Sequence, residues 1–372
     1  MNPRTVLISG ASIAGLTTAH WLHRHGFAVT VVERADGLRP GGQAVDVRGA
    51  AVEVAARMGI VERVREHATG FRGMTMVDAD GAELFRSEEV TFTGGEIAGD
   101  DIEIMRDDLN QIIHSTLDGV AFVFGDSISA LADSGDGVRV DFDNAASRDF
   151  DLVIGADGLR SRTRKIAFGP HETYLRPMGG HIGIFSLPNY LGLDRWQIIQ
   201  NLPDTTAVLY SARDPRQARA IIGFRDDDMA AVDAATAMDL LDRHFAAVGW
   251  EIPNLLRHMR NADDFYFTSA AQIHMDSWHA GRVGLVGDAG YCGSPLTGQG
   301  SSMALVGGYV LAAELAASDD PEAGLRSYET ALRPFVDANQ ALAELNAAAN
   351  GQPDPEILTK AANAIELRDL AS

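Results

Sequence analysis

The chain has 372 residues, of which 46% are hydrophobic, and its 31 basic and 52 acidic side chains give a formal net charge of −21. This length and composition fit a globular protein with one large or two smaller domains. The acidic balance excludes a phosphate polymer as partner, because nucleic-acid binding needs clustered cations, and the single cysteine, Cys292, excludes a disulfide framework or a cysteine-rich metal site.

The first 33 residues predict one βαβ unit. An apolar strand over 6–8 runs into a turn that starts at Gly10, and a helix over 16–22 ends before Gly26. A second strand over 28–32 ends on Glu33. The apolar run at the N-terminus is too short for a signal peptide, and no run approaches the roughly 18 residues of a membrane helix. We therefore expect a cytoplasmic protein without a membrane partner.

The turn after the first strand is typical of a dinucleotide site. Gly10 permits a tight turn, Gly15 lets the helix approach the sheet, and N–H groups at the helix N-terminus suit a pyrophosphate. Ser12 replaces the usual middle glycine of G-x-G-x-x-G. Glu33 is placed to accept a ribose hydroxyl and disfavours a 2′-phosphate, so the sequence predicts FAD or NAD rather than NADP at this turn.

Further along, the pattern predicts a β-rich middle and a helical end. Short strands and turns fill 72–100, a helix occupies the second half of 101–114, hairpin strands follow over 121–142, and a buried strand covers 150–154. Residues 170–278 alternate as strands, with one helix over 235–248. A strand over 282–286, a glycine-rich loop, a long helix from 301 and a helical tail after Pro334 complete the chain.

Three more motifs follow the dinucleotide turn in order. Arg106 opens a helix, and residues 157–164 fit D-G-x-x-S-x-x-R. Residues 287–300 combine Gly-Asp-Ala, Pro295 and Gly-Gln-Gly after a buried strand. The alternative for 157–164 is an Asx-type turn with Arg164 in a surface salt bridge.

Together these motifs resemble the single-component (class A) FAD-dependent aromatic hydroxylases, over about residues 4–335. Tyr291 and Ser302, where much of the family has His and Asn, match the branch that contains tetracycline- and polyketide-modifying enzymes. The resemblance implies an α/β fold: a Rossmann-type FAD-binding domain (1–71, 101–168, 279–335), an inserted β-rich substrate domain (72–100, 169–278) and a C-terminal helical segment (336–372).

The resemblance also implies a set of flavin contacts. Arg48, Pro295, Gly298 and Gly300 would lie near the flavin, although no residue is assigned as a certain catalytic group. The expected cofactor-binding residues are Gly10, Ser12, Gly15, Glu33, Arg34, Asp46, Arg48, Arg106, Asp157, Gly287, Asp288, Pro295, Gly298 and Gly300. An ordinary turn with an exposed Arg48 is the alternative for the segment 43–49. In the glycine loop, helix N-terminal N–H groups would stabilise the negative charge of a reduced flavin.

The implied reaction needs FAD, NAD(P)H as co-substrate and O2, with oxygen transfer from a flavin hydroperoxide to an aromatic or polycyclic small molecule. The chain lacks a second dinucleotide motif, so NAD(P)H would dock transiently. His181, Arg213 and Phe224 are candidate substrate contacts, no metal is expected, and the protein would be a monomer or homodimer.

Three other functions stay open. A flavin-dependent halogenase would carry W-x-W-x-I-P and a lysine near the substrate, but the two lysines, Lys165 and Lys360, lie near no such segment. A reductase of the same superfamily and a non-catalytic flavin-binding protein are the others. Purified protein that is yellow and consumes NAD(P)H and O2 with substrate would favour the monooxygenase.

Overall fold

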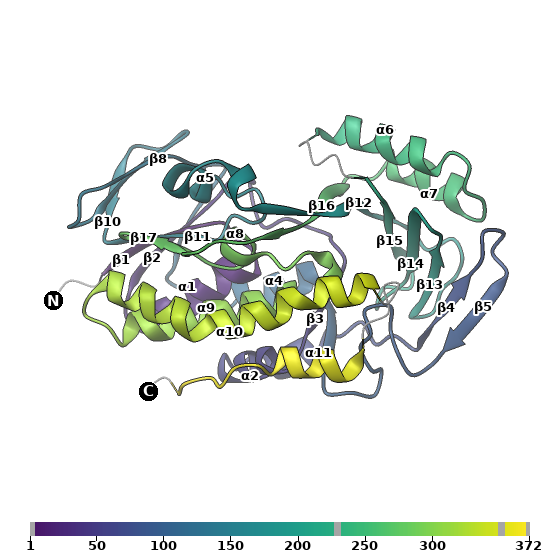
Figure 1. Ribbon diagram of the computed structural model, residues 1–372, viewed down its shortest axis with the longest axis horizontal. Coiled ribbons are helices and arrows are strands. Elements are labelled where there is room, and N and C mark those ends of the chain that lie inside the picture. The colour runs from purple at the N-terminus through teal and green to yellow at the C-terminus, as the bar shows by residue number, and fades with distance from the viewer. Residues whose placement is uncertain (1–3, 227–231, 349–353, 370–372) are drawn as a thin grey trace.

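The computed structural model describes residues 4–226, 232–348 and 354–369, and Figure 1 shows their arrangement. Two large sheets lie toward opposite ends of the ribbon, and long C-terminal helices run beneath them. Within the described residues, no helix has both the length and the hydropathy needed to span a bilayer.

A six-stranded sheet contains the predicted βαβ unit. Its order is β17-β18-β11-β1-β2-β7, with β17 antiparallel to β18 and the other neighbours parallel. The strands are β1 (Thr5–Ser9), β2 (Ala28–Glu33), β7 (Ala121–Phe124), β11 (Leu152–Gly155), β17 (His279–Ala280) and β18 (Val283–Leu285). Continuous apolar runs such as 6–8 form these strands because both faces of a parallel sheet are buried.

Helices cover this sheet in layers. α1 (Ile13–Arg24) connects β1 to β2 and packs against α9 (Gly300–Ala316), which in turn contacts α2 (Ala50–Arg57) and α10 (Pro321–Ala348). The α1–α9 approach is close: a Cβ atom on Gly308 would lie 3.0 Å from Cβ of Thr17. The largest apolar cluster of the chain fills these layers.

A small three-stranded sheet lies where the sequence predicts hairpin strands over 121–142 and a single strand over 150–154. It consists of β8 (Ile128–Asp133), β9 (Val138–Phe142) and β10 (Arg148–Phe150), and α5 (Arg162–Phe168) packs on β8. The expected single strand over 150–154 is therefore two strands in different sheets. The chain changes sheet at Asp151, whose Oδ2 accepts hydrogen bonds from the N–H (2.6 Å) and hydroxyl (2.8 Å) of Thr5. β7, expected in a hairpin, instead extends the parallel sheet.

The second large sheet has the order β16-β12-β15-β14-β13-β4-β5. Its strands are β4 (Gly73–Val77), β5 (Glu83–Ser87), β12 (Leu175–Pro188), β13 (Trp196–Asn201), β14 (Thr205–Tyr210), β15 (Gln217–Phe224) and β16 (Tyr266–Ile273). β4 pairs in parallel with β13, so residues 73–87 and 175–273 share one sheet. This pairing agrees with the expected division of the substrate domain, although the domain limits themselves stay a prediction.

The two faces of this sheet have different neighbours. α6 (Ala234–Phe245) and α7 (Ile252–Met259) cover one face through a cluster that includes Leu241, Leu255 and Phe185. The other face meets a ribbon of β3 (Ala44–Val47) and β6 (Ile102–Met105), and the Ala44 N–H donates to Tyr210 Oη at 2.8 Å. The sequence predicts α6 but not α7. The second residue of α7 is Pro253, and a proline can indicate either the end of a helix or, as here, its first turn.

The C-terminal region is helical, as predicted. The expected boundary between the FAD-binding domain and the C-terminal segment, after residue 335, lies inside the continuous helix α10. α11 (Pro355–Ala362) packs against α10 and approaches Gly49, where a Cβ atom would lie 2.6 Å from the Ala362 carbonyl oxygen. The remaining helices are α3 (Val61–Glu66), α4 (Arg106–His114), α8 (Asp288–Tyr291) and two 3-10 turns, His171–Thr173 and Pro295–Thr297.

Candidate functional site

The first glycine-rich turn lies at the carboxyl end of β1. Gly10 has φ +109°, and a Cβ atom there would lie 2.5 Å from the Ala156 carbonyl oxygen. A Cβ atom on Gly15 would overlap the carbonyl oxygen of Gly10, so both positions require glycine. Ser12 is exposed and makes no side-chain cap. The first N–H groups of α1 therefore keep the anion-binding capacity that the sequence predicts.

Glu33 ends β2 beside this turn. One carboxylate oxygen accepts the Ala11 N–H at 2.8 Å and the other accepts the Ala35 N–H at 2.9 Å. Each oxygen retains a second lone pair for a hydroxyl donor. Arg34 follows on the surface. The structure thus brings Glu33 to the glycine turn and fixes its orientation.

The Asp157–Arg164 segment folds on itself before it contacts the next motif. Asp157 accepts hydrogen bonds from the Ser161 hydroxyl (2.5 Å) and from the N–H and hydroxyl of Thr163 (2.9 Å each), which holds the first turn of α5. Arg164 is fully buried and donates to the Ala289 carbonyl oxygen at 2.7 Å. The alternative of a surface salt bridge for Arg164 is therefore wrong, because its guanidinium links α5 to α8.

The Gly287–Asp288 turn lies against the first motif. Gly287 has φ +64°, and a Cβ atom there would lie 2.7 Å from Cβ of Ala14 in α1. Asp288 begins α8 with its side chain exposed. The Gly10 and Gly287 turns, 277 residues apart in sequence, thus adjoin each other, and the buried Arg164 holds the second one in place.

The loop before α9 carries two unusual backbone positions. Gly298 is left-handed (φ +64°), and Ser294 has φ +74° with ψ +149°, a region that side chains rarely adopt. Pro295 and Gly300 are exposed. Gln299 is fully buried, yet neither its amide nitrogen nor its amide oxygen has a hydrogen-bond partner within the described residues. This loop is under conformational constraint and holds an unsatisfied amide.

Residues from the other sheet and from α10 hold this loop. Gln272 on β16 donates to the Gly293 carbonyl oxygen at 3.2 Å, and Gln340 on α10 donates to that of Cys292 at 3.0 Å. The sequence does not predict that these two glutamines contact the loop, because the residues around them show only an ordinary apolar pattern. Burial raises the pKa of the Cys292 thiol, so that thiol is not a nucleophile near neutral pH.

Arg48 lies at the end of β3 and is 1% exposed. Its Nη2 is 3.0 Å from Asp46 Oδ1 and donates to the Thr93 carbonyl oxygen at 3.2 Å. Its backbone N–H donates to the Ser302 hydroxyl at 3.1 Å, which ties β3 to α9. The alternative of an exposed Arg48 in an ordinary turn is wrong. A Cβ atom on Gly298 would lie 3.9 Å from Arg48 Nη1, so the guanidinium adjoins the glycine loop.

Arg106 opens α4, as predicted, and reaches the segment after Glu33. Its Nη2 donates to the Gly41 carbonyl oxygen at 2.7 Å, and a Cβ atom on Gly42 would lie 2.5 Å from its Nε. Burial and the nearby Arg39 lower its pKa, although the group remains cationic at any physiological pH. Arg106 thus adds a half-buried positive charge beside Gly41 and Gly42.

Two of the three expected substrate contacts lie on the helix-covered face of the seven-stranded sheet. His181 is 3% exposed and stacks between Phe224 and Phe267 at centroid distances of 5.2 and 5.3 Å. Phe224 also stacks on His244 of α6. Arg213 is exposed and donates to the Glu66 carbonyl oxygen. This packing places His181 and Phe224 in the core beneath α6, and their contact with substrate stays a prediction.

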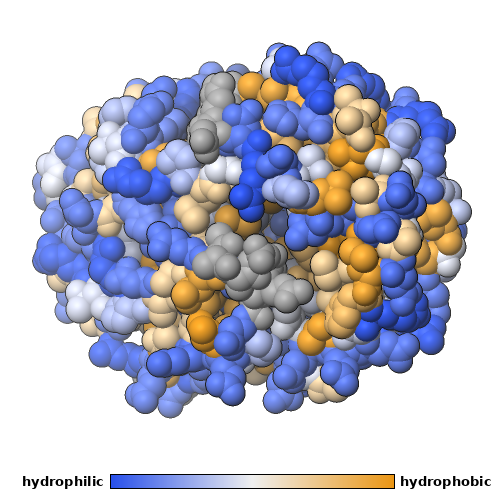
Figure 2. All heavy atoms as spheres, turned by 45° about the vertical axis from the view of Figure 1, so that its right-hand side comes forward, coloured by the Kyte–Doolittle hydropathy of each residue, from blue (hydrophilic) through white to orange (hydrophobic). Residues whose placement is uncertain are grey.

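The opposite face of that sheet is only partly covered, because Arg219 and Ile221 are half-buried there. Ile184, Arg219 and Ile221 alternate with the core residues along β12 and β15, and they lie on the side of β3. Arg219 donates to the Gly42 carbonyl oxygen at 3.2 Å. Figure 2 views the molecule from nearer this sheet and shows a hollow near the middle, with hydrophobic and hydrophilic side chains around it.

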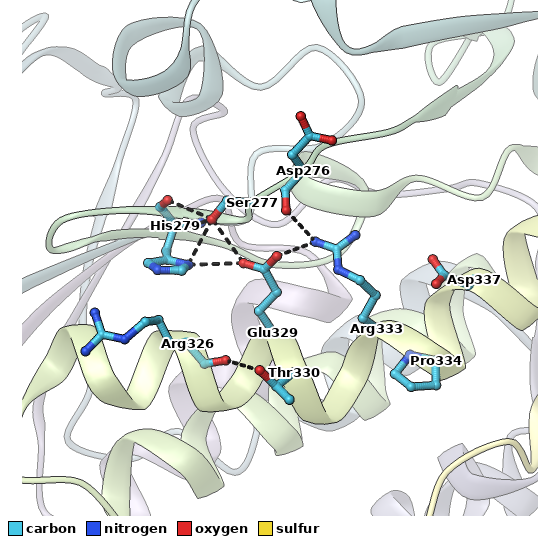
Figure 3. A pocket seen from close by; sticks show the side chains of 9 residues that line it. All are labelled: Asp276, Ser277, His279, Arg326, Glu329, Thr330, Arg333, Pro334 and Asp337. Atoms are coloured by element: carbon cyan, nitrogen blue, oxygen red, sulfur yellow. Dashed lines mark hydrogen bonds and ion pairs between the residues drawn. The ribbon is translucent and has the colours of Figure 1, made fainter.

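A separate surface pocket lies between β17 and α10 (Figure 3). Ser277, His279 and Glu329 meet there, which suggests a hydrolytic triad at first sight. Ser277 Oγ (3.0 Å) and Glu329 Oε2 (3.1 Å) both contact Nδ1 of His279, however, and Ser277 Oγ also donates to Glu329. The imidazole therefore does not lie between the hydroxyl and the carboxylate as a general base requires.

The unsatisfied polar atoms test whether a cofactor fits the site. Arg48 Nη1 and both amide atoms of Gln299 are buried without partners, and these residues flank Gly298. Buried polar groups are nearly always hydrogen-bonded in a complete structure, so this concentration indicates a polar ligand at the loop. No cluster of three or more metal-binding side chains occurs in the parts of the chain that the structure describes. The donors and glycines suit a dinucleotide with a polar ring.

Comparison with known proteins agrees with this geometry. A family model described as FAD binding domain matches residues 4–343. A flavin-dependent monooxygenase of Legionella longbeachae is 38% identical over 338 residues, covering 90% of this chain and 86% of its own. An uncharacterized protein of Mycobacterium tuberculosis is 48% identical over 370 residues, covering 98% of this chain and all of its own.

A solved structure gives the same result for the fold. The crystal structure of the tetracycline destructase Tet(55) aligns with a TM-score of 0.88 and 37% identity, covering 99% of both chains. The expected α/β fold with an FAD-binding domain is confirmed, and so is the expected enzyme family.

Proposed function

The chain belongs to the FAD binding domain family and is a flavin-dependent monooxygenase, and on this premise we propose which residues hold FAD and which class of molecule it oxidises. The observation that carries the proposal is the contact of Gly287 with Ala14. It joins the turn suited to a pyrophosphate with the loop that contains the unsatisfied Gln299.

The dinucleotide end of FAD would lie at the first turn. The N–H groups after Gly10 and Ser12 would bind the pyrophosphate, with the positive end of the α1 dipole behind them. Glu33 would accept a hydroxyl of the adenosine ribose, and the exposed Arg34 lies beside it. Gly15 acts indirectly, because its missing Cβ permits α1 to sit against the turn.

The flavin end would lie between β3 and the glycine loop. Arg48, Gly298, Gly300 and Pro295 would border the ring, with Asp46 behind Arg48. Gln299 is a further candidate, because its buried amide can meet the donors and acceptors of a pyrimidine edge.

The connecting diphosphate and ribityl chain would lie between these ends. Asp288 would accept a ribityl hydroxyl, and Gly287 would let α8 approach. Arg106 would contribute charge. Asp157 would act indirectly, since its oxygens already accept three hydrogen bonds within its own segment.

Bound FAD would supply the redox chemistry, with NAD(P)H as the hydride donor and O2 as the source of the transferred oxygen atom. One oxygen atom enters the substrate and the other leaves as water. The protein positions the substrate, excludes bulk water and holds charge near Arg48 and the α9 N-terminus. Since no second dinucleotide motif exists in the sequence, NAD(P)H would dock transiently.

The substrate would be an aromatic or polycyclic, polyketide-like molecule. The face of the seven-stranded sheet opposite α6 supports this, because the half-buried Ile221 and Arg219 place an apolar side chain and a guanidinium on the same side of β15. The likeness to a tetracycline destructase points to the same class. We further propose a monomer or homodimer that works in the cytoplasm, which size-exclusion chromatography and cell fractionation would test.

The decisive experiment combines cofactor content with product mass. The purified protein should be yellow, and a polycyclic phenol should raise NAD(P)H oxidation and O2 uptake and yield a product heavier by one oxygen atom. Protein that retains no FAD would overturn the proposed site. Halide incorporation would favour a halogenase, product formation without O2 uptake a reductase, and FAD retention with no turnover of any tested aromatic a non-catalytic flavoprotein.

A further inference from the structure

A buried ionic cluster lies on the β3–β6 ribbon next to the glycine loop. Asp46 of β3 and Glu103 of β6 are directly opposite in the antiparallel register, so two carboxyl groups share one side of the ribbon. Arg48 follows two residues after Asp46 on the same face. The cluster of Asp46, Arg48 and Glu103 is called the ribbon trio below.

The guanidinium of Arg48 makes its hydrogen bonds through Nη2, whereas Nη1 makes none. Nη2 contacts Asp46 at 3.0 Å and donates to the carbonyl and hydroxyl oxygens of Thr93 at 3.2 and 3.1 Å. Nη1 has no hydrogen-bond partner, although the side chain is 1% exposed. The guanidinium adjoins Gly298 with this free donor group. A buried cationic donor without an acceptor is costly, which indicates an acceptor on a ligand.

The carboxyl groups of the trio differ in their partners. Asp46 has Arg48 and the Thr93 hydroxyl, whereas Oε2 of Glu103 is buried without a partner. Burial and the facing Asp46 raise the pKa of Glu103 well above its ordinary value. Thr91 from the covering loop and Tyr210 from β14 also face Glu103, and Asp101 on the adjoining chain contacts Arg48 at 3.5 Å. Burial raises the pKa of Asp46 as well, but Asp46 keeps its ion pair with Arg48 whereas Oε2 of Glu103 has no partner, so we assign the proton of the pair to Glu103.

We propose that Arg48 donates its free N–H to the flavin and favours the reduced cofactor, and that Asp46 and Glu103 are positioning residues that keep Arg48 in place and balance its charge. This inference rests on the proposed FAD site. Reduction of a flavin by two electrons and one proton leaves one negative charge on the ring. A cation that is already oriented and desolvated stabilises that charge without reorganisation.

The proton on Glu103 sets the net charge of the trio. With Glu103 protonated, Arg48 and Asp46 cancel, and the free donor of Arg48 acts on the ring. With Glu103 ionised, the trio carries one net negative charge, which opposes reduction through the low-dielectric interior. Glu103 thus acts through Arg48 and not by contact with the substrate.

The first test measures the midpoint potential and the affinity of bound FAD. Arg48→Gln should weaken the binding of reduced FAD roughly tenfold more than that of oxidised FAD, which lowers the two-electron potential by about 30 mV. Arg139→Gln is the matched control, because Arg139 also pairs with an aspartate (Asp149, 3.0 Å) but lies exposed on β9. An unchanged potential in Arg48→Gln that retains FAD would overturn the inference.

The second test uses pH and decides the question even if Arg48→Gln does not fold. Glu103→Gln should match the wild-type potential at low pH, where Glu103 is protonated, and exceed it increasingly as pH rises and wild-type Glu103 ionises. A purely structural role for Glu103 would give a difference that does not vary with pH, and this result would overturn the inference. Wild-type protein that takes up no FAD would instead overturn the proposed function, so the two failures are distinguishable.

Discussion

Gly10 and Gly26 both have positive φ angles, +109° and +80°, but their surroundings differ. A Cβ atom on Gly10 would meet the Ala156 carbonyl group, whereas nothing lies within 4 Å of one on Gly26. Gly26→Ala should therefore cost only the backbone strain of about 1 kcal/mol. Gly10→Ala should cost about 3 kcal/mol and abolish FAD retention, because the turn itself must move.

Urea unfolding of both variants, with a titration of added FAD, checks this contrast. Equal losses of stability for the two alanines would show that backbone strain alone explains the requirement for glycine at position 10. Retention of FAD by Gly10→Ala would show that the turn does not bind the pyrophosphate.

Glu103 also makes stability depend on pH. Because its pKa is higher in the folded than in the unfolded chain, the folded state favours the protonated form. The contribution of Glu103 to stability is therefore complete below the ordinary glutamate pKa of about 4.3 and is lost as pH rises through the raised value. The stability of Glu103→Gln relative to wild type should therefore rise progressively as pH rises above the ordinary glutamate pKa of about 4.3.

Urea midpoints at several pH values measure this difference. Glu62→Gln serves as control, since Glu62 is exposed and pairs with Arg65 within α3. A pH-independent difference for Glu103→Gln, or the same trend in Glu62→Gln, would contradict the assigned proton.

At the scale of elements, α5 connects the motif at 157–164 to the motif at 287–300. Arg164 and Arg162 lie on the same helix, but Arg164 is buried against the Ala289 carbonyl oxygen while Arg162 forms an exposed pair with Asp143. Arg164→Met should destabilise the protein by about 2–4 kcal/mol, because buried carbonyl groups lose a charged donor. Arg162→Met should cost less than about 1 kcal/mol.

The same pair of variants reports on the cofactor. Loss of Arg164 frees α8 from α5, so FAD should bind more weakly in Arg164→Met at a temperature where the variant is still folded. Isothermal titration with FAD measures this effect. Similar affinities in Arg164→Met and Arg162→Met would show that α5 does not hold the Gly287 turn.

Elements with strong local signals could be predicted from the sequence. The βαβ unit, the strand before Gly287 and the helix after Gly300 all follow from apolar runs bounded by glycine. The division at Asp151 could not be predicted, because it depends on hydrogen bonds to Thr5 in a distant strand. For the same reason sequence patterns could not show which face of β12 receives α6, or that His181 stacks on Phe224 beneath that helix.

In the candidate site, the glycines and the charged motif residues could be identified from the sequence. The residues that hold them in place through hydrogen bonds or strand pairing could not. Gln272 and Gln340 reach the loop from β16 and α10, and Glu103 meets Asp46 only through strand register. Nothing in their local sequence distinguishes them from ordinary surface or core residues. Such contacts arise only when segments far apart in the chain are brought together.

At the scale of the whole molecule, the C-terminal segment closes one side of the FAD-binding layers. Tyr309 on α9 donates to the Arg368 carbonyl oxygen at 2.6 Å, and Leu358 of α11 packs with Leu342 of α10. A chain that ends at residue 353 should therefore melt several degrees lower than the full chain. A chain that ends at 369 keeps these contacts and should melt as the full chain does; an equal drop in both would contradict this role of α11.

The order of strands in the six-stranded sheet has a consequence for biosynthesis. β1 is made first, yet its neighbour β11 and the next strand, β18, come from far later in the chain. At translation rates of about 5–20 residues per second, β1 waits on the order of 10 s for β11, and β11 then waits about as long before Leu285 leaves the ribosome. During these intervals the apolar edge of the waiting strand is open to wrong pairing, so the nascent chain should depend on chaperones until β18 is made.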